Sequence, residues 1–492
     1  MKTLTCIILL SASMGSQAQE QLTEQREQKP SHAWIMPSHD GQGRRQWTEQ
    51  REQKPSHAWV MPSHNGQGRS QWTAEQCIQY AVTQGHSVRM QAIYMDDCKT
   101  EKTRAIGSFL PSVNASMSGQ YNFGRAIDPQ TNTYTNVSTF YNSYGLSAQI
   151  PIFDGLQRYN DLRASQANLL MGRSRQEAQK DMTAQAVLYN YMQVLYCKGS
   201  IEIATQKRSE SEMLLKQTKV MAEMGRKSEA DVAQMLATYA ADDYEVTHQQ
   251  GLYDKALLAL KQQMNYPADK PLLLCAFEIP PTQETTPLME TDHDIYAQAK
   301  LSNPEIKQAE YSLLSARYAY RSSKGALLPS ISLGAGISTT YYKQLNAPAQ
   351  ENFRSQFRNN TGEYIYASLS LPIFNRLNTI SNIRRQRNNV RKAEEELAYQ
   401  TSELQRLIME SITNLENSRR EMEKMKQKME ADSIASKLTT RKYEEGLASP
   451  IDVQTGAVIL MQSKAQLLQS QLTYIYNSRI LNYYKGTPLW TE

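Results

Sequence analysis

The chain has 492 residues, of which 21% are charged, and its formal net charge is +5 at neutral pH. A mean hydropathy of −0.61 is polar for this length, which argues against one large compact core. The small net charge predicts no nucleic-acid partner. We interpret the one dense basic run, between Arg384 and Lys392, as the solvated start of a helix rather than a nucleic-acid patch.

The first residues have the pattern of a secretory signal. Lys2 supplies the positive charge, Leu4 to Leu10 the apolar stretch, and Ala18 ends a cleavage site of small residues. We therefore expect residues 1–18 to be a signal peptide and the chain to be exported. No later stretch approaches about 18 consecutive apolar residues, so we expect any membrane insertion to use strands.

Residues 19–72 hold a tandem repeat with a period of 25, Thr23 to Trp47 and Thr48 to Trp72. Gln, Pro, Ser, Gly and Arg dominate it, which predicts disorder. The repeat carries four histidines, but they lack the Cys or acidic partners of a metal site, so we predict no metal or other cofactor. These histidines are His32, His39, His57 and His64.

Four cysteines follow the signal segment, the first two being Cys77 and Cys98. In an exported protein these two could bridge a pair of short antiparallel helices. Buried free thiols are the alternative, and the spacing leaves both open.

A second, longer repetition organises the rest of the chain into repeats 73–285 and 286–492. The matching pairs are Leu110–Val113 with Leu328–Ile331, Ile150–Phe153 with Leu371–Phe374, and Gly225–Val232 with Gly446–Val453. The first pair has a slightly shorter offset than the other two, which share one longer offset. We call residues related by these offsets mates. This duplication predicts a pseudo-symmetric fold of two equivalent hairpins.

Four segments alternate apolar and polar residues with the period of a strand. A soluble half-buried sheet alternates in the same way, but lengths of about 10 to 13 residues and tyrosines near the ends favour tilted membrane strands. Four strands cannot close a barrel and lipid tolerates no open edge, so copies would have to associate, and three would give twelve strands. The segments are Val113–Phe123, Phe140–Ile152, Ile331–Tyr341 and Ile365–Ile373.

Proline and polar residues mark the ends of these predicted strands. Pro151 and Pro372 are expected to close the second strand of each half and to turn the chain from sheet to helix. The polar segments 125–136 and 343–362 are predicted to be external loops.

Long proline-free segments predict helical hairpins in both halves. Asp154 to Glu223 could form roughly 100 Å of helix, and Glu229 to Asn265 returns. The second half repeats this pattern with Asn382–Glu444 and Pro450–Tyr484. Apolar residues three and four apart form narrow stripes that suit coiled-coil packing.

Glycines mark the tip of each predicted hairpin. Gly225 and Gly446 can end a helix in the left-handed conformation, and a serine can cap the returning helix. Asp231 and Asp452 lie at matching places in its first turn. The helix dipole alone explains such residues, but copies arranged about an axis would make them a ring of carboxylates.

The duplication, the strand marks and the tips Ala222–Val232 and Tyr443–Val453 together resemble the TolC family of outer-membrane efflux proteins, over about residues 72–486. The segment Trp72–Val82 resembles the start of these domains, particularly in Bacteroidota. The resemblance implies an α+β membrane protein: a homotrimer whose long α-helical hairpins form a periplasmic α-barrel. Four strands per protomer would complete a 12-stranded outer-membrane β-barrel in contact with lipid.

The resemblance also implies roles for the tips. They would meet a periplasmic adaptor linked to an inner-membrane pump of the RND or ABC type. Asp452 matches an acidic residue of the closed aperture, whereas Thr455 replaces a second family aspartate and Arg226 an apolar residue. Gly225, Gly446, Leu447 and Ser449 match positions that contact adaptors.

We therefore expect a passive duct of the outer membrane, extending into the periplasm, that serves tripartite efflux or type I secretion. A periplasmic coiled-coil adaptor is the alternative, but adaptors pair one hairpin with compact β-domains. The chain contains none of the common catalytic motifs, so we expect no enzyme.

Overall fold

The computed structural model describes residues 71–127, 132–136, 138–275, 292–345 and 351–489. All of them belong to one compact unit, Gln67–Glu492. The signal peptide predicted at 1–18, and the tandem repeat except for its last two residues, lie outside the described residues.

The helices repeat as the sequence duplication predicts. The shorter ones form two pairs of mates with equal length, related by the shorter offset, with 11 residues in α2 and α6 and 22 in α3 and α7. They are α2 (Ala74–Gln84), α3 (His86–Gly107), α6 (Asp292–Ser302) and α7 (Pro304–Gly325).

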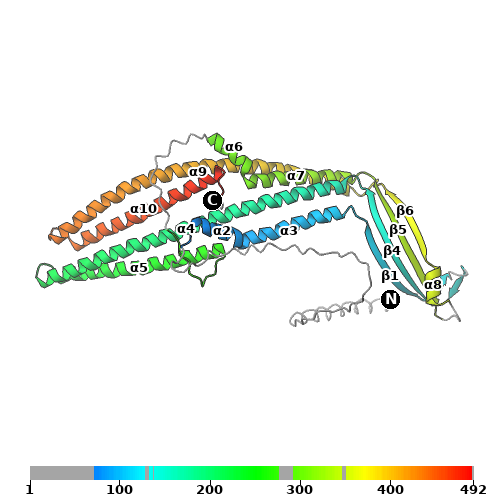
Figure 1. Ribbon diagram of the computed structural model, residues 1–492, viewed down its shortest axis with the longest axis horizontal. Coiled ribbons are helices and arrows are strands. Elements are labelled where there is room, and N and C mark those ends of the chain that lie inside the picture. The colour runs from blue at the N-terminus through cyan, green and yellow to red at the C-terminus, as the bar shows by residue number, and fades with distance from the viewer. Residues whose placement is uncertain (1–70, 128–131, 137, 276–291, 346–350, 490–492) are drawn as a thin grey trace, which may run out of the picture. The chain divides into compact units, whose positions relative to one another are not determined.

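The long helices follow the longer offset and confirm both predicted hairpins. Each hairpin has an outgoing helix of 67 residues and a return of 36 or 35 residues. The first is α4 (Gln157–Glu223) with α5 (Glu229–Met264), and the second is α9 (Asn378–Glu444) with α10 (Pro450–Tyr484). Figure 1 shows the two hairpins pointing the same way, with the sheet at the opposite end of α4 and α9.

The four predicted strands form one antiparallel sheet in the order β1-β4-β5-β6. The pairing keeps apolar residues on one face, for example Leu146 opposite Ile337. The central β4–β5 pair joins the two halves, while β1 and β6 form the edges. The strands are β1 (Ser112–Asn122), β4 (Thr139–Phe153), β5 (Ser330–Gln344) and β6 (Gly362–Ser370).

Both connections predicted to be plain loops contain further structure. The first holds a small hairpin of β2 (Arg125–Ile127) and β3 (Tyr134–Asn136), and the second holds α8 (Phe353–Asn359). Strand β6 pairs with β5 only as far as Ser338. Beyond it, the Gln356 side chain accepts from the Tyr342 N–H and donates to the Tyr342 carbonyl oxygen, both at 2.9 Å. Helix α8 thus satisfies part of an edge that β6 leaves open.

The buried side chains gather on the first hairpin. Helix α4 packs between α3 and α7 and has 21 buried residues, whereas its mate α9 has 6. One long face of α9 is therefore open in the single chain. Within the described residues, no helix combines the length and apolarity needed to cross a membrane.

Two glycines bring the halves into backbone contact where the sheet meets the helices. Gly155 has φ +68°, and a Cβ there would strike the carbonyl oxygen of Gly325; the converse also holds. Only glycine at both positions lets the start of α4 lie this close to the end of α7.

The structure decides between the disulfide and the free thiols that the cysteine spacing left open. Cys77, Cys98 and Cys197 are buried and Cys275 is partly so, and all four are free thiols. Burial raises the pKa of Cys77 to about 12, which keeps the thiol protonated at neutral pH.

Candidate functional site: the hairpin tips

Both hairpins turn through the same backbone motif. Gly225 and Gly446 have φ of +75° and +81°, in the left-handed region. The N–H of the next residue bonds back to the helix end, from Arg226 to the Met221 oxygen at 2.8 Å and from Leu447 to the Lys442 oxygen at 2.7 Å. Because a Cβ at either glycine would meet nothing within 4 Å, backbone conformation alone selects glycine.

The two predicted aperture aspartates close identical capping boxes. Asp452 Oδ2 accepts from the N–H of Ser449 at 2.9 Å, and Ser449 Oγ accepts from the Asp452 N–H at 3.2 Å. Asp231 and Ser228 repeat this arrangement at 3.0 and 3.2 Å. Each carboxylate therefore stabilises the start of its helix, where the dipole also favours negative charge.

These hydrogen bonds also set the ionisation of the two aspartates. The backbone and side-chain bonds from Ser449 hold the pKa of Asp452 below its ordinary value, and Ser228 does the same for Asp231. Both groups are therefore anionic at neutral pH, with one oxygen, Oδ1, outside the cap.

Tyr443 ties the two hairpins together near their tips. Its ring is 1% exposed, and its hydroxyl lies 2.8 Å from Thr218 Oγ1 of the first hairpin. Lys227 Nζ lies 3.9 Å from the ring centroid, a cation–π contact. The ring packs in a cluster with Leu214, Leu215, Met235 and Val453.

Sequence reasoning did not single out Tyr443 as a contact, although it opens the tip segment quoted for the family resemblance. An aromatic three residues before a helix-ending glycine was the available signal, but only the structure shows which helix it meets.

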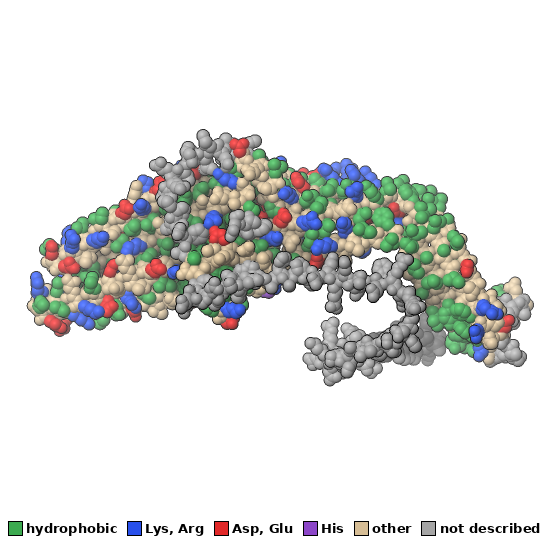
Figure 2. Space-filling model, in the orientation of Figure 1, with side chains coloured by type: hydrophobic (Ala, Val, Ile, Leu, Met, Phe, Trp, Pro, Cys, Tyr) green, Lys and Arg blue, Asp and Glu red, His purple; other side chains and the backbone are tan. Residues whose placement is uncertain are grey.

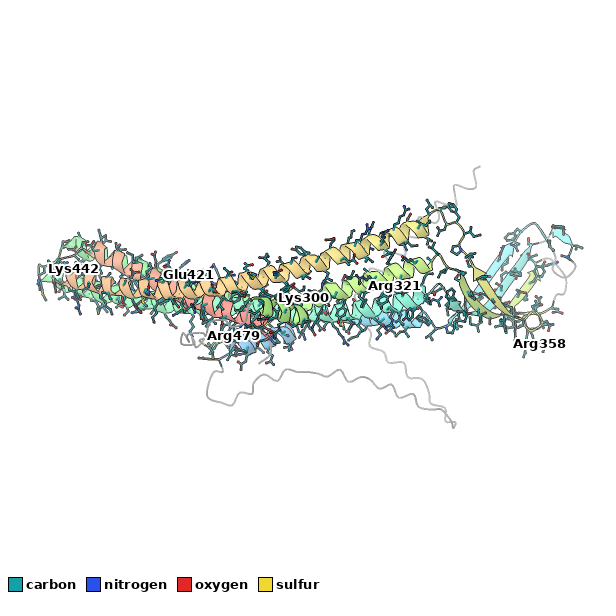
Figure 3. The ribbon with its side chains drawn as sticks, turned by 90° about the horizontal axis from the view of Figure 1, so that it is seen from above. Lys300, Arg321, Arg358, Glu421, Lys442 and Arg479 are labelled. Atoms are coloured by element: carbon teal, nitrogen blue, oxygen red, sulfur yellow. The ribbon has the colours of Figure 1, made fainter. Side chains whose placement is uncertain are left out.

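Other residues at the tips are exposed to solvent. Leu447 is 74% exposed and Ile451 is also exposed, whereas Arg226 puts a cation at the matching place of the first tip. Charged side chains crowd this end in Figure 2, and Figure 3 shows Lys442 there. The two tips thus share a backbone and differ in the chemistry they present.

The prolines expected at the sheet-to-helix turns lie before the turns. Pro151 is still inside β4, opposite Ser332, where the pairing register shifts. Pro372 follows the end of β6. The reversals occur later, at Gly155 and Leu156 in the first half and at Arg376 and Leu377 in the second, all with positive φ.

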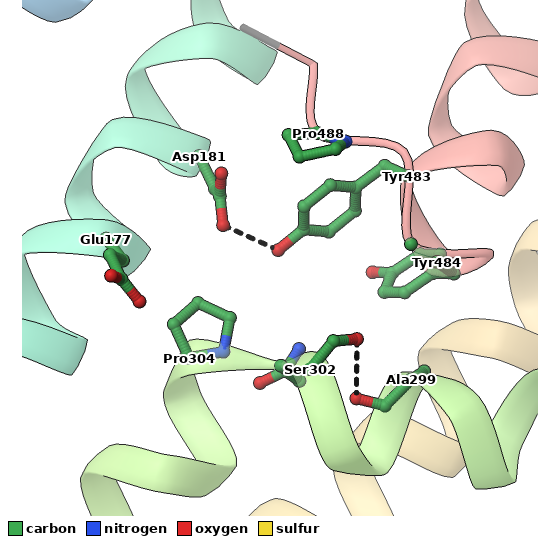
Figure 4. A pocket seen from close by; sticks show the side chains of 10 residues that line it. Glu177, Asp181, Ala299, Ser302, Pro304, Tyr483, Tyr484 and Pro488 are labelled. Atoms are coloured by element: carbon green, nitrogen blue, oxygen red, sulfur yellow. Dashed lines mark hydrogen bonds between the residues drawn. The ribbon is translucent and has the colours of Figure 1, made fainter. Parts of the chain in front are cut away.

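A small cavity of about 150 Å³ lies where α4, α7 and the end of α10 meet. Asp181 Oδ2 accepts from the Tyr483 hydroxyl at 2.9 Å (Figure 4). Burial raises the pKa of Tyr484 to about 12, so it stays a neutral phenol. The cavity lies at the seam between the two halves of the chain.

Among the residues that the structure describes, no group of three or more His, Cys, Asp and Glu side chains is placed to hold a metal. The four repeat histidines lie outside the described residues.

Comparison with known proteins identifies the family. The family model for outer membrane efflux protein matches residues 78–265 and 295–483, one match in each half. Outer membrane efflux protein BepC of Brucella suis biovar 1 (strain 1330) is 21% identical over 355 residues, covering 72% of this chain and 73% of BepC.

Solved structures agree on the fold. The crystal structure of CusC has a TM-score of 0.69 at 17% identity, covering 86% of this chain and 95% of CusC. The outer membrane protein VceC from Vibrio cholerae has a TM-score of 0.69 at 14% identity, covering 85% of this chain and 96% of VceC. The duplicated hairpins, the four-stranded sheet and the matches in both halves show that the chain belongs to the family of outer membrane efflux proteins.

Proposed function

We propose that three copies of this chain form a passive exit duct of the outer membrane. Their strands close a twelve-stranded barrel, their helices continue it through the periplasm, and their tips form the inner aperture. A periplasmic adaptor connects the tips to an RND or ABC-type pump, which supplies the energy. Membership of the efflux family supports this, and so does the symmetry of the chain.

The unpaired sheet edges favour association of copies. Every residue of β6 and nearly every residue of β1 is exposed, and each strand has a partner on one side only. Such edges are not tolerated in lipid, and pairing β6 of one copy with β1 of the next removes them.

The duplication predicts the register of that pairing. Within the chain, Ala148 of the first half lies opposite Ala335 of the second. The mate of Ala148 by the longer offset is Leu369, and the mate of Ala335 by the shorter offset is Met117. Leu369 of one copy therefore lies opposite Met117 of the next, with both on the apolar face.

The helices support the same arrangement. The α4–α7 contact joins first half to second, so its mate is a contact between α9 and α3 of the next copy. The open face of α9 fits this contact. A Cβ at Gly107, the mate of Gly325, would meet nothing within 4 Å in the single chain, whereas the mate of Gly155 is Arg376, so the contact between copies is less close than the one between Gly155 and Gly325.

Six hairpin tips would then surround one axis. Asp231 and Asp452 would contribute their capped carboxylates to a ring at the aperture. Gly225, Gly446, Leu447 and Ser449 would lie on the surface that the adaptor contacts.

A cysteine cross-link tests the assembly. With Cys275 replaced by Ser, the pair Met117→Cys and Leu369→Cys should give covalent trimers on a denaturing gel, because opposed Cβ atoms lie about 4.5–5.5 Å apart. Ser118→Cys with Leu369→Cys is the control, since a shift of one residue moves the side chain to the other face. A soluble periplasmic monomer, or equal cross-linking in both pairs, would contradict the proposal.

Single-channel conductance tests the aperture. Asp452→Ala should change conductance or its block by multivalent cations, because a carboxylate is lost from each copy. Ser449→Ala, which weakens the cap but keeps the charge, should leave the block nearly unchanged. Equal behaviour of Asp452→Ala and the parent would remove the aperture role.

A further inference from the structure

Three arginines of the basic run near the start of α9 have no ionic partner among the described residues. Arg384, Arg387 and Arg391 are exposed, and no ion pair involves them in the part of the chain that the structure describes. No acidic residue occurs between Arg376 and Lys392. Figure 2 shows Lys and Arg side chains gathered over the sheet end of α7 and α9, and Figure 3 places Arg321 of α7 there.

The first half shows what this face of α9 meets. Arg163, the mate of Arg384, donates to the Tyr159 hydroxyl at 3.2 Å, and this bond is the main cause of its raised pKa. Tyr318 of α7, the helix that packs along α4, also raises it, in keeping with a guanidinium on the α7 side of α4. The contact between Gly155 and Gly325 gives the same alignment of the two helices. Arg163 lies eight residues after Gly155 and Tyr318 lies seven residues before Gly325, so both lie at about the same distance along the helices from that contact. The mate of Tyr318 is Thr100 of α3.

The same mapping brings acidic residues opposite the arginines. Ser315 lies on the same helix face as Tyr318, three residues on, and as Ala319, four residues on. The mates of Ser315 and Ala319 in α3 are Asp97 and Glu101. Glu101 already pairs with Arg104 at 2.7 Å. Asp97 is exposed and takes part in no ion pair among the described residues.

Asp97 then lies level with Arg387 and about one turn from Arg384 and Arg391. The mates of these four residues belong to the α4–α7 contact within one chain. Three of them are uncharged, Ser315 for Asp97, Gln166 for Arg387 and Leu170 for Arg391, and only Arg163 keeps the charge of Arg384. The seam within a chain is therefore mostly neutral, and the seam between copies is charged.

We propose that Arg384, Arg387 and Arg391 of one copy enclose Asp97 of the next copy and hold the subunits in register. This clasp rests on the trimer proposed above and adds a specific, salt-sensitive contact to it. Opposite charges across an interface speed association and exclude wrong registers. A single carboxylate does not neutralise three guanidinium groups, so the contact between two copies keeps a net positive charge.

Charge reversal tests the clasp in the full-length chain in detergent. Asp97→Arg should raise the protein concentration at half-assembly by about tenfold or more, measured by mass photometry, because like charges then face one another. The matched control is Asp96→Arg, one residue away, whose carboxylate pairs with Lys99 within the same helix. The difference between the variants should shrink at about 1 M salt, where the screening length falls to about 3 Å.

Rescue separates the clasp from misfolding. Arg384→Asp with Arg391→Asp should restore assembly when combined with Asp97→Arg, because opposite charges meet again. Equal effects of Asp97→Arg and Asp96→Arg, or no rescue, would overturn the clasp. Loss of binding to phosphatidylglycerol vesicles in Arg384→Asp/Arg391→Asp, with assembly unchanged, would assign the run to lipid and also overturn it.

The strand cross-link shows which proposal fails. If Met117→Cys with Leu369→Cys gives no covalent trimer in the Cys275→Ser chain without charge substitutions, the trimer proposed above is wrong. If that cross-link forms and the charge variants assemble alike, only the clasp is wrong.

Discussion

The two hairpins hold their helices together with the same residue types in different places. In the first hairpin, Lys207 of α4 pairs with Asp242 of α5 at 2.8 Å, with side chains 13% and 4% exposed. In the second, Lys428 pairs with Asp432 of the same helix at 3.0 Å, with side chains 45% and 22% exposed. Ser463 of α10 completes the second network, accepting from Lys428 at 2.5 Å and donating to Asp432.

The duplication shows that these networks are mates. By the longer offset, Lys207 corresponds to Lys428, Ser211 to Asp432 and Asp242 to Ser463. Asp and Ser have thus exchanged helices. A buried ion pair crosses the first hairpin in this network, whereas the hydroxyl of Ser463 makes the crossing in the second. Separating α9 from α10 at this level should therefore cost less than separating α4 from α5.

Removing Asp242 should have the largest effect on this difference. Asp242→Ala leaves Lys207 buried without its partner, which should lower the free energy of unfolding by about 3–5 kcal/mol. Asp432→Ala, at the partly exposed pair, should cost about 1 kcal/mol or less. Thermal unfolding of the solubilised protein measures both, and equal losses would mean that the two networks hold their hairpins equally well.

Exchanging the residues of the first network should convert it to the pattern of the second. Ser211→Asp with Asp242→Ser keeps the charge balance, so its loss of stability should be smaller than that of Asp242→Ala. Hydrogen exchange in the middle of α5 should nevertheless be faster than in the parent, because the ion pair no longer crosses the hairpin. Exchange as slow as in the parent would show that the placement of the charge is unimportant.

Tyr443→Phe should have a moderate effect where the two hairpins meet. The substitution removes the hydrogen bond between the Tyr443 and Thr218 hydroxyls, but the Thr218 hydroxyl still donates to the Leu214 oxygen. We therefore expect the free energy of unfolding to fall by about 1 kcal/mol. Channel conductance should rise if this bond holds the tips closed. Lys227→Gln, which removes the cation above the ring, is the comparison; a larger effect from it would identify the cation–π contact as the main link.

Acid should have the smallest effect and should act on both tips alike. Asp231 and Asp452 have pKa values held below their ordinary 3.8, so their caps contribute at pH values above 3.8. That contribution is lost as pH falls through the lower folded pKa. Circular dichroism should show a small loss of helix at that acidic pH. The double variant Asp231→Asn with Asp452→Asn should already lack the contribution of the charged caps at neutral pH.

Much of the fold could be predicted because the helices and strands follow local periodicity. The glycine tips and their capping serines are also local, and the predicted residues adopt those roles. Helix α8 escaped prediction because Asn, Gln, Thr, Pro and Gly in segment 343–362 are typical of a loop, whereas Phe353 and Phe357 pack against Tyr144 of a distant strand.

The contacts between hairpins could not be predicted in the same way. The Tyr443–Thr218 bond joins residues 225 apart, and the Lys207–Asp242 pair depends on the rotation of each helix about its axis. Periodicity identifies a buried face but not which partner lies opposite each residue on it. The prediction put the sheet-to-helix turns at Pro151 and Pro372, a few residues before the observed ones. Proline marks where strand pairing weakens, whereas residues with positive φ mark where the chain reverses.

The equal length of α4 and α9 limits how this family member can evolve. Each has 67 residues, so both tips reach the same level. A deletion of seven residues from one helix alone would withdraw its tip by about 10 Å. Changes in helix length must therefore occur in both halves together. The short stretch by which the two repeat offsets differ falls between the strands of a half, where an insertion changes the length of neither long helix.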